Sequence, residues 1–396
     1  MNTADFDSPL PATCEDSGEA LFSAPVDSPV EWKDIAVEDF EAYRQCVTPL
    51  NQVGYQTDSE RDALVDIHPK GFFIRQPPLP HELDTHMTPD AQLFQTIHMG
   101  AAVVDPNRWR LIVDGMVLHP FMLNLGQLRS MPRTSVTTFH ECYGSPLLPP
   151  TRAVRRVGNM AQPKGSASYV WSEGLDGGIF ADVWADRYQK DLPLEKAMAP
   201  EVLLAFEING APLDKERGGP VRLVVPGWYG TNSTKWISHI SLQDKRATGP
   251  YTTLFYNEID PADPDGQQRR PVWKVEPNSI IVRPRPGAVF ASGHTITVIG
   301  RAWACEEIVQ VEISTDGGNS WCNAQLNPRR EFEWQLFQQR VVFSRGGFYT
   351  ITARATDKRG QQQPLRNRRN HVPTKASLTN GILVYDAVRE RLSPSP

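Results

Sequence analysis

The chain has 396 residues, of which 40% are hydrophobic and 22% charged, and its formal net charge at pH 7 is −5. A charge of this size and sign argues against nucleic acid or an anionic membrane surface as a partner. No apolar run reaches the roughly 18 residues of a membrane-spanning helix, so we expect no membrane partner either.

The compartment is inferred from the cysteines and the amino terminus. The five cysteines show neither CxxC nor another zinc-ligand spacing, which favours a reducing, intracellular environment. The acidic amino terminus lacks the apolar core of a secretory signal and the arginines of a mitochondrial presequence. We therefore expect a soluble intracellular protein, cytoplasmic by default, with mitochondria and peroxisomes as alternatives.

The first two-thirds of the chain combine a polar tail with an α+β domain. Residues 1–60 are acidic and poorly periodic, which predicts a flexible tail. Residues 61–260 mix short strands, one or two helices and irregular loops, which is typical of an α+β fold. The segment 121–131 has helical leucine spacing at Leu123, Leu125 and Leu128. Buried strands are expected at RWRLIVDGMV (108–117), VLLAFEING (202–210) and VRLVVPGWYG (221–230).

The last third has a purely β pattern. Residues 261–277 contain PADPDGQQRRP and predict a linker, and residues 387–396 predict a short tail. Between them, residues 278–386 alternate in hydrophobicity and have glycine-rich turns, which predicts an all-β immunoglobulin-like sandwich. Shared faces are expected for Val309, Val311 and Ile313, and for Tyr349, Ile351, Ala353 and Ala355.

Cys142 lies in TFHECYGSPLLPP (138–150), between an acidic residue and a tyrosine–glycine turn. These residues leave three interpretations open: a small buried side chain, a nucleophile or a metal ligand. His140 lies two residues earlier and would share a strand face with Cys142, as a Cys–His pair requires, but no third orienting group is evident.

The segment RGGPVRLVVPGWYGTNSTKW (217–236) could bind an anion. It carries Arg217, Arg222 and Lys235 together with turn hydroxyls, and Gly227 and Gly230 would let the backbone approach a ligand. Neither a Walker motif nor GxGxxG is present, so a nucleotide loop is not expected. A hairpin with solvated basic residues is the structural alternative.

These segments resemble the sulfite oxidase family of molybdenum enzymes. VLLAFEINGAPL followed by 217–236 matches the core signature of the family almost residue for residue, and EGLD (173–176), DLPLEKAM and VEISTDGGNSW add to the match over about residues 65–375. The resemblance implies a molybdopterin-binding domain followed by an immunoglobulin-like dimerisation domain, and hence a homodimer. It also implies the molybdenum–molybdopterin cofactor, a small anionic substrate with sulfite as the default, and oxygen-atom transfer.

The resemblance also assigns roles to single residues. Cys142 would bind molybdenum through its thiolate. Arg75, Tyr256 (with Tyr251 as competitor) and Arg369 (beside Arg368) would serve the substrate. The cofactor would be held by Asp176, Arg217, Arg222, Asn232, Ser233, Thr234 and Lys235.

The chain departs from the family in four places. It reads CYGSPL where the family has arginines after the cysteine, Pro77 and Arg217 stand where the family has histidines, and the segment between Cys142 and EGLD is short. A substrate-pocket tryptophan is therefore expected to be missing, which leaves a different substrate or a non-catalytic cofactor-binding protein as alternatives. We expect no haem or flavin domain, so electrons would pass to dioxygen or to an external acceptor.

Overall fold

The computed structural model describes residues 79–83, 85–143, 162–260, 262–263 and 265–363, with the backbone of a few short strands outside these ranges. The predicted tails at 1–60 and 387–396 lie outside the described residues, apart from the two-residue strand β1 (Thr48–Pro49). No helix in the described part of the chain is long and apolar enough to span a membrane.

A five-stranded sheet forms the centre of the first unit. Its order is β13-β10-β18-β6-β7, with β18 and β6 parallel and the other pairs antiparallel. Its strands are β6 (Arg110–Gly115), β7 (Phe121–Asn124), β10 (Tyr169–Gly174), β13 (Gln189–Pro193) and β18 (Ile237–Gln243). Leu111, Ile112 and Val113 of β6 are all buried, because other parts of the chain cover both faces of this inner strand.

The predicted helix over 121–131 is only partly confirmed. Residues 121–124 form β7, and helix α4 covers only Leu125–Ser130. Asn124 begins the helix with a capping box, in which its side chain accepts from the Gln127 backbone and the Gln127 side chain accepts from the Asn124 backbone. Leu123 reaches the same apolar core as Leu125 and Leu128, but it does so from a strand. The helical spacing therefore arose across a strand–helix boundary.

Short elements surround the central sheet and form much of the site. The predicted strands near 202–210 and 221–230 are present as short pairs. The elements are β2 (Asp66–His68), β3 (Phe72–Arg75), η2 (Pro80–Glu82), η3 (Asp90–Gln92), β4 (Gln95–Ile97), β5 (Ala102–Val103), β8 (Val136–Thr138), β9 (Thr151–Ala153), β11 (Gly178–Phe180), β12 (Val183–Ala185), α5 (Leu194–Ala197), β14 (Leu203–Ala205), β15 (Glu207–Ile208), β16 (Ala211–Pro212), β17 (Arg222–Val224), η4 (Gly230–Asn232) and α6 (Pro250–Thr253).

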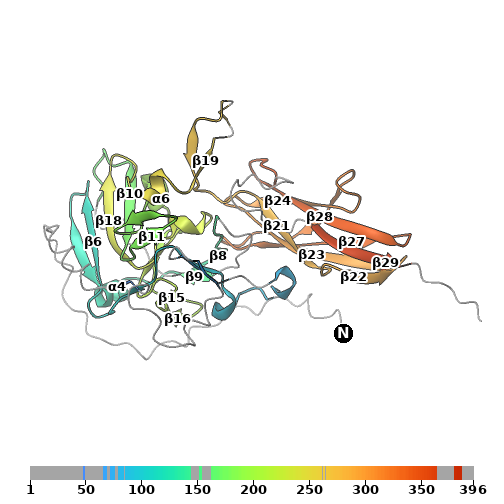
Figure 1. Cartoon of the computed structure of the whole chain (residues 1–396), viewed down its shortest axis with the longest axis horizontal. Coiled ribbons are helices and arrows are strands. Elements are labelled where there is room, and N and C mark those ends of the chain that lie inside the picture. The colour runs from blue at the N-terminus through green and yellow to red at the C-terminus, as the bar shows by residue number, and fades with distance from the viewer. Residues whose placement is uncertain are drawn as a thin grey trace, which may run out of the picture.

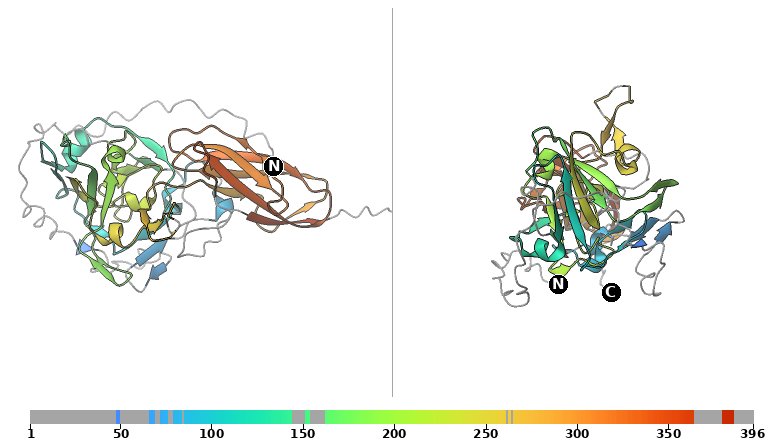
Figure 2. Two further views of the ribbon diagram at one scale, coloured as in Figure 1. Left: turned by 90° about the horizontal axis from the view of Figure 1, so that it is seen from above. Right: turned by 90° about the vertical axis from the view of Figure 1, so that its left-hand side faces the viewer.

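The second unit is almost entirely strand and extends to one side of the first (Figures 1 and 2). Two sheets, ordered β21-β23-β27-β26 and β22-β29-β28-β24-β25, contribute to one apolar core. The strands are β21 (Asn278–Arg283), β22 (Ala288–Ala291), β23 (Thr295–Trp303), β24 (Ile308–Ser314), β25 (Cys322–Asn323), β26 (Gln325–Leu326), β27 (Gln335–Val342), β28 (Gly347–Asp357) and β29 (Thr379–Tyr385).

The residues predicted to share one face do so on β28, but on β24 the prediction is wrong for Val309. Ile351, Ala353 and Ala355 are buried in the core and Tyr349 packs against it, as expected. Val309 is 55% exposed and does not share the buried face of Val311 and Ile313. An irregularity in register between residues 308 and 310 breaks the alternation, so that Ile308 is buried instead.

The stretch 261–277 contains structure of its own. Strand β20 (Arg269–Pro271) pairs with β19 (Asn257–Ile259), and the resulting hairpin projects from the molecule (Figure 1). Val272 and Val275, just beyond the hairpin, are buried. The connection between the two units is therefore packed against them at its carboxyl end.

A charged network crosses three strands of the central sheet. The ring of His239 on β18 contacts Glu173 of β10 at 3.0 Å and Asp114 of β6 at 2.8 Å, and Arg187 contacts Glu173 at 2.7 Å. Burial alone would lower the pKa of His239, but the two carboxylates raise it to about 9. Burial would raise the pKa of Glu173, but His239 and Arg187 lower it to about 2.

We predict that His239→Gln lowers the free energy of unfolding by roughly 1–3 kcal/mol at pH 6. Because the folded-state pKa of His239 is raised above 6.5, this contribution is complete below pH 6.5 and is lost as the pH rises through about 9. Denaturant unfolding at pH 6 and pH 10 measures it, with the exposed His294→Gln as the matched control. An equal loss at both pH values would contradict the charged state of His239.

Candidate active site

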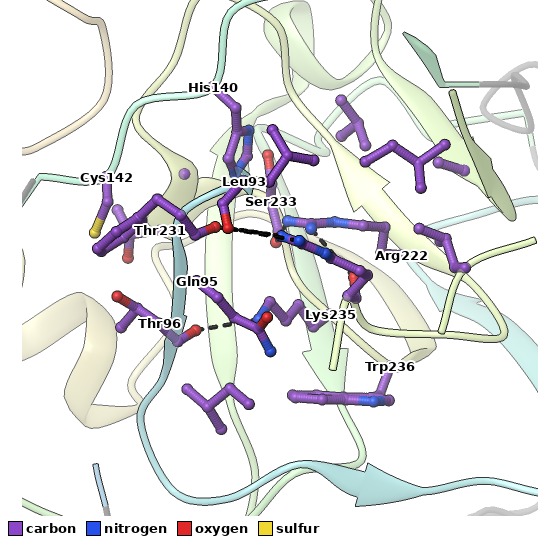
Figure 3. A pocket seen from close by; sticks show the side chains of 18 of the residues that line it. Leu93, Gln95, Thr96, His140, Cys142, Arg222, Thr231, Ser233, Lys235 and Trp236 are labelled. Carbon is purple, nitrogen blue, oxygen red and sulfur yellow. Dashed lines mark hydrogen bonds between the residues drawn. The ribbon is translucent and has the colours of Figure 1, made fainter. Parts of the chain in front are cut away.

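A cavity in the first unit brings together residues that are far apart in the sequence. It encloses about 1040 Å³ of space not filled by atoms, part of it open to solvent. Its walls come from five segments: 93–98 around β4, 140–142 after β8, 176–188 after β10, 205–217, and 222–236 from β17 to β18. Cys142 lies at one side of this cavity, and Arg222, Lys235 and Trp236 lie at the opposite side (Figure 3).

Three cationic side chains line the cavity. The guanidinium of Arg217 donates to the backbone carbonyls of Asp90, Leu93 and Phe94. The guanidinium of Arg222 donates to the carbonyl oxygens of Arg217 and Ser233, both at 3.2 Å. The Lys235 ammonium donates to Thr96 O at 3.1 Å and to Glu216 O at 2.9 Å. Backbone carbonyls therefore position all three cations beside one another.

The cations weaken one another's charged forms. Burial and the positive charges of Arg222 and Arg217 lower the pKa of Lys235 to about 7. Burial and the neighbouring Arg217 lower the pKa of Arg222 to about 10. The Nε of Arg222 is buried and has no hydrogen-bond acceptor among the described residues. Buried cationic groups of this kind are suited to bind an anionic ligand.

Two histidines of the cavity are neutral. Burial, Lys235 and Lys190 lower the pKa of His98 to about 3. Burial, Arg222 and Lys235 lower the pKa of His140 to about 3 as well. Both rings are therefore uncharged at neutral pH and can donate from one nitrogen and accept at the other.

Asp176 is one of two acidic residues that line the cavity, together with Glu207, and it is 4% exposed. It follows the turn at the end of β10, where Gly174 passes close to the site. A Cβ atom at Gly174 would lie 2.4 Å from Asp176 Oδ1 and 2.7 Å from Lys235 O, so a side chain has no space there. The glycine of EGLD is thus required for Asp176 and Lys235 to approach each other.

The turn around η4 contributes alternate residues. Thr231 and Ser233 line the cavity, whereas Asn232 and Thr234 are not among its lining residues. The Asn232 amide donates to Tyr229 O at 2.9 Å and to Val272 O at 3.1 Å, and the Thr234 hydroxyl contacts Ser172 Oγ at 2.7 Å. Of the three predicted turn residues, only Ser233 lies in the cavity wall, because successive side chains of this turn point in different directions.

Tyr256 belongs to an aromatic cluster behind the cavity. Its hydroxyl makes a short contact with His98 Nε2, and its backbone has a φ of +57°, a left-handed conformation that is uncommon for tyrosine. Burial and the neighbouring Tyr188 raise the pKa of Tyr256 well above 10. The competitor Tyr251 is fully buried under the rings of Tyr188 and His98. Neither tyrosine lines the cavity, but the hydroxyl of Tyr256 contacts His98, which does.

The two substrate arginines cannot be assigned a position in the cavity. Arg75 ends β3 and pairs in register with Gln95 of β4, a cavity residue, but its side chain lies outside the described structure. Arg369, Pro77 and residues 144–161 of the short segment after Cys142 also lie outside the described residues, apart from the backbone of β9. The roles of Arg75 and Arg369 stay predictions.

The sequence did not single out several residues of the cavity wall. His98 and Tyr188 are isolated in the sequence, Thr96 lies in a short β-strand, and Thr231 precedes the predicted turn residues. His140 was considered only as a partner for the thiol. The one available signal was the alternation of His140 with Cys142, which places both on the cavity side of their segment.

Comparison with known proteins identifies the class of site. Residues 98–251 match the oxidoreductase molybdopterin-binding domain, and residues 269–375 match the Mo-co oxidoreductase dimerisation domain. Most of the residues that line the cavity, including Cys142 and the three cations, lie inside the first match, which is to a molybdopterin-binding oxidoreductase domain. The chain belongs to the sulfite oxidase family, a family of molybdenum enzymes.

The relatives are distant but cover most of the chain. Sulfite oxidase of Gallus gallus is 28% identical over 80% of this chain and 76% of its own length. Mitochondrial sulfite oxidase of Homo sapiens is also 28% identical, and the chain spans 63% of that protein. The crystal structure of the sulfane dehydrogenase SoxCD from Paracoccus pantotrophus aligns over 78% of this chain and 84% of that chain, with a TM-score of 0.64 and 26% identity.

The cavity fits the molybdopterin cofactor by its donor set. Molybdopterin carries a phosphate and a metal-binding dithiolene, and the cavity has cationic donors at one side and a thiol at the other. The buried Nε of Arg222, which has no acceptor among the described residues, is a donor suited to an anionic group. The residues present are thus compatible with the cofactor that the family binds.

We predict that sulfate stabilises the cofactor-free protein, as an oxyanion in the place of the cofactor phosphate. Sulfate keeps its charge between pH 6 and pH 8.5, whereas Lys235, with a pKa of about 7, is protonated mainly at the lower pH. The rise in Tm over chloride at equal ionic strength is therefore larger at pH 6. Lys235→Met removes most of this pH dependence and the exposed Lys164→Met does not; equal behaviour of both variants would contradict anion binding at Lys235.

Proposed function

We propose that this protein oxidises sulfite to sulfate by oxygen-atom transfer and passes the electrons to dioxygen or to an external acceptor. The observation that carries the proposal is the presence of Cys142 and the cation cluster Arg217, Arg222 and Lys235 in the wall of one cavity. The names of the relatives, sulfite oxidase in several animals and in Arabidopsis thaliana, support sulfite as the substrate.

Different side chains would bind the metal, the phosphate and the pterin of the cofactor. Cys142 would bind the metal as a thiolate, which suits a soft ligand environment. Arg222, Lys235 and Arg217 would bind the phosphate end, where charge-assisted hydrogen bonds are strongest. Asp176 and Ser233 would bind the pterin side. When bound, the molybdenum cofactor supplies the two-electron redox chemistry of oxygen-atom transfer.

Binding of the sulfite anion requires positive charge and a hydrogen-bond donor that keeps its proton. A surplus of cations around the cavity attracts sulfite, which is an anion. Arg75 and Arg369 would bind the anion directly. Tyr256 would donate a hydrogen bond from its hydroxyl, and the neutral His98 beside it would orient that hydroxyl.

A different substrate is the second candidate. The chain reads YGSPL after Cys142, where the family has arginines, so one anchor for sulfite is missing. The family's relatives include a nitrate reductase of Aspergillus niger, 26% identical over 71% of this chain, and the sulfane dehydrogenase named above. A purified enzyme with molybdenum should therefore be assayed with sulfite, thiosulfate and nitrate; a preference for one of the latter two would favour this candidate.

The domain organisation is part of the proposal. We place the molybdopterin-binding domain at 61–260 and the second domain at 278–386, in broad agreement with the matched family models. The two sheets around one core support an immunoglobulin-like sandwich for the second domain. Its match to a dimerisation domain supports a homodimer. A mitochondrial location, as in the human relative, is the alternative to the cytoplasm.

Cys142→Ser is predicted to lower molybdenum content or its redox activity at least about tenfold, because an alcohol is a poor ligand for a soft metal centre. Metal analysis and sulfite-dependent ferricyanide reduction measure both properties. Cys322→Ser, at an exposed strand of the second unit, is the matched control and should change neither. Full molybdenum-dependent activity in Cys142→Ser would refute the ligand assignment, and a wild-type protein without molybdenum would refute the enzyme.

Tyr256→Phe is predicted to lower kcat by about 10-fold to 100-fold, since one hydrogen-bond donor to the reacting anion is lost. The high-pH limb of the rate profile should stay where it is in the wild type. The pKa of Tyr256 is raised well above 10, so its hydroxyl keeps the proton over the working pH range. A high-pH limb that disappears in the variant would show that Tyr256 titrates during turnover.

A further inference from the structure

The segment that carries Cys142 lies between the two units of the molecule. Its backbone continues from β8 and pairs with the second unit: Phe332 N donates to Thr137 O at 3.1 Å, and Phe139 N donates to Phe332 O at 2.9 Å. The backbone N–H of Thr137 donates to the Glu331 carboxylate. The second unit thus adds a strand-like contact to the segment just before the cysteine.

Side chains alternate along this segment. Phe139 and Glu141 point into the second unit, where Phe139 packs near the ring of Trp303, whereas His140 and Cys142 line the cavity. This is the two-residue period of an extended chain. The position of the Cys142 thiol therefore depends on the contacts that Phe139 and Glu141 make with the second unit.

Glu141 is held by side-chain hydrogen bonds from the second unit. Its side chain is fully buried, and its two oxygens accept hydrogen bonds from Trp303 Nε1 at 2.7 Å and from Asn278 Nδ2 at 3.4 Å. Trp303 ends β23 and Asn278 begins β21, so both donors belong to the four-stranded sheet of the second unit. Gln363 donates to the Asn278 side-chain oxygen at 2.9 Å and extends the network into that unit.

The backbone of Glu141 binds the neighbouring part of the cavity wall. Gly230 N donates to Glu141 O at 2.6 Å, and Gly230 begins the η4 turn that places Thr231 in the cavity. A Cβ atom at Gly230 would lie 2.8 Å from His140 Nε2, so the turn and the cysteine segment are in close contact. One residue therefore connects the second unit, the cysteine segment and the cofactor-binding turn.

We propose that Glu141 is a positioning residue, through which the second unit holds the thiol of Cys142 in its place in the cavity. The second unit then has a role at the site as well as the role in dimerisation that its family model names. The proposal rests on the proposed function only in taking Cys142 as the metal ligand. The restraint on the segment follows from the hydrogen bonds alone.

The test measures the thiol in the cofactor-free full-length protein. Alkylation of Cys142 by iodoacetamide is followed by peptide mass spectrometry, with the exposed Cys322 of the same chain as internal reference. Glu141→Ala and Trp303→Phe should each raise the Cys142 rate at least about fivefold, because the segment opens more often when the tie is lost. The double variant should be no faster than the faster single one, since both remove the same hydrogen bond.

Two matched variants control for general loosening. Glu141→Gln keeps an acceptor for the indole N–H and should return the rate to within about twofold of wild type. Glu312→Ala removes a partly buried carboxylate that contacts Arg354 at 2.7 Å within the second unit, away from the cysteine segment, and should leave the rate unchanged. Trp303→Phe carries the test if Glu141→Ala does not fold.

The loaded enzyme gives the second measurement. Trp303→Phe should retain molybdenum yet lose about tenfold in kcat, with shifted thiolate-to-metal absorption bands, because the ligand is present but displaced. Alkylation rates within twofold of wild type in both Glu141→Ala and Trp303→Phe would overturn the proposal, as would a Glu141→Gln rate equal to that of Glu141→Ala. If Cys142→Ser kept full molybdenum-dependent activity, the assignment of Cys142 as the metal ligand would fall, while the alkylation rates would still decide whether Glu141 restrains the segment.

Discussion

The burial of three cationic side chains, Arg217, Arg222 and Lys235, beside one another is the constraint on which the site depends. Burial first, and the neighbouring positive charges second, lower the pKa values of Arg222 and Lys235, so the charged forms are costly to hold here. Backbone carbonyls of Leu93, Thr96 and Ser233 offset part of that cost and hold the side chains in place. The carboxylates of Asp176 and Asp214 act in the same direction at Lys235. A cavity lined by these buried cations is suited to an anionic ligand.

The same region shows how the two units cooperate. The first unit supplies the cations and Asp176, while the cysteine segment is held from the second unit through Phe139 and Glu141. The cavity side with Cys142 and the side with the cations are therefore supported by different parts of the molecule.

Hydrophobic patterns in the sequence predicted the structure correctly where they lay within a single strand. Residues 294–303 alternate and form β23, and the alternating residues of β28 reach the core. Patterns failed where two elements met or where register changed. The leucines of 121–131 belong to a strand and a helix in succession, and Val309 faces solvent because the β24 register is irregular there. The spacing of apolar residues along the chain does not show where one element ends or where the strand register changes.

The sequence by itself determined the family, because the contiguous segment 217–236 carries most of that signal. It also predicted a shared site for Cys142, Arg217, Arg222 and Lys235, which line one cavity. Only the tertiary structure decided which side chains share the cavity. His98, Thr231 and Tyr188 join it, and Asn232 and Thr234 turn away, since these positions depend on chain segments that approach each other across the fold. The burial of Glu141 against Trp303 was likewise invisible in the sequence, because 162 residues separate the two partners.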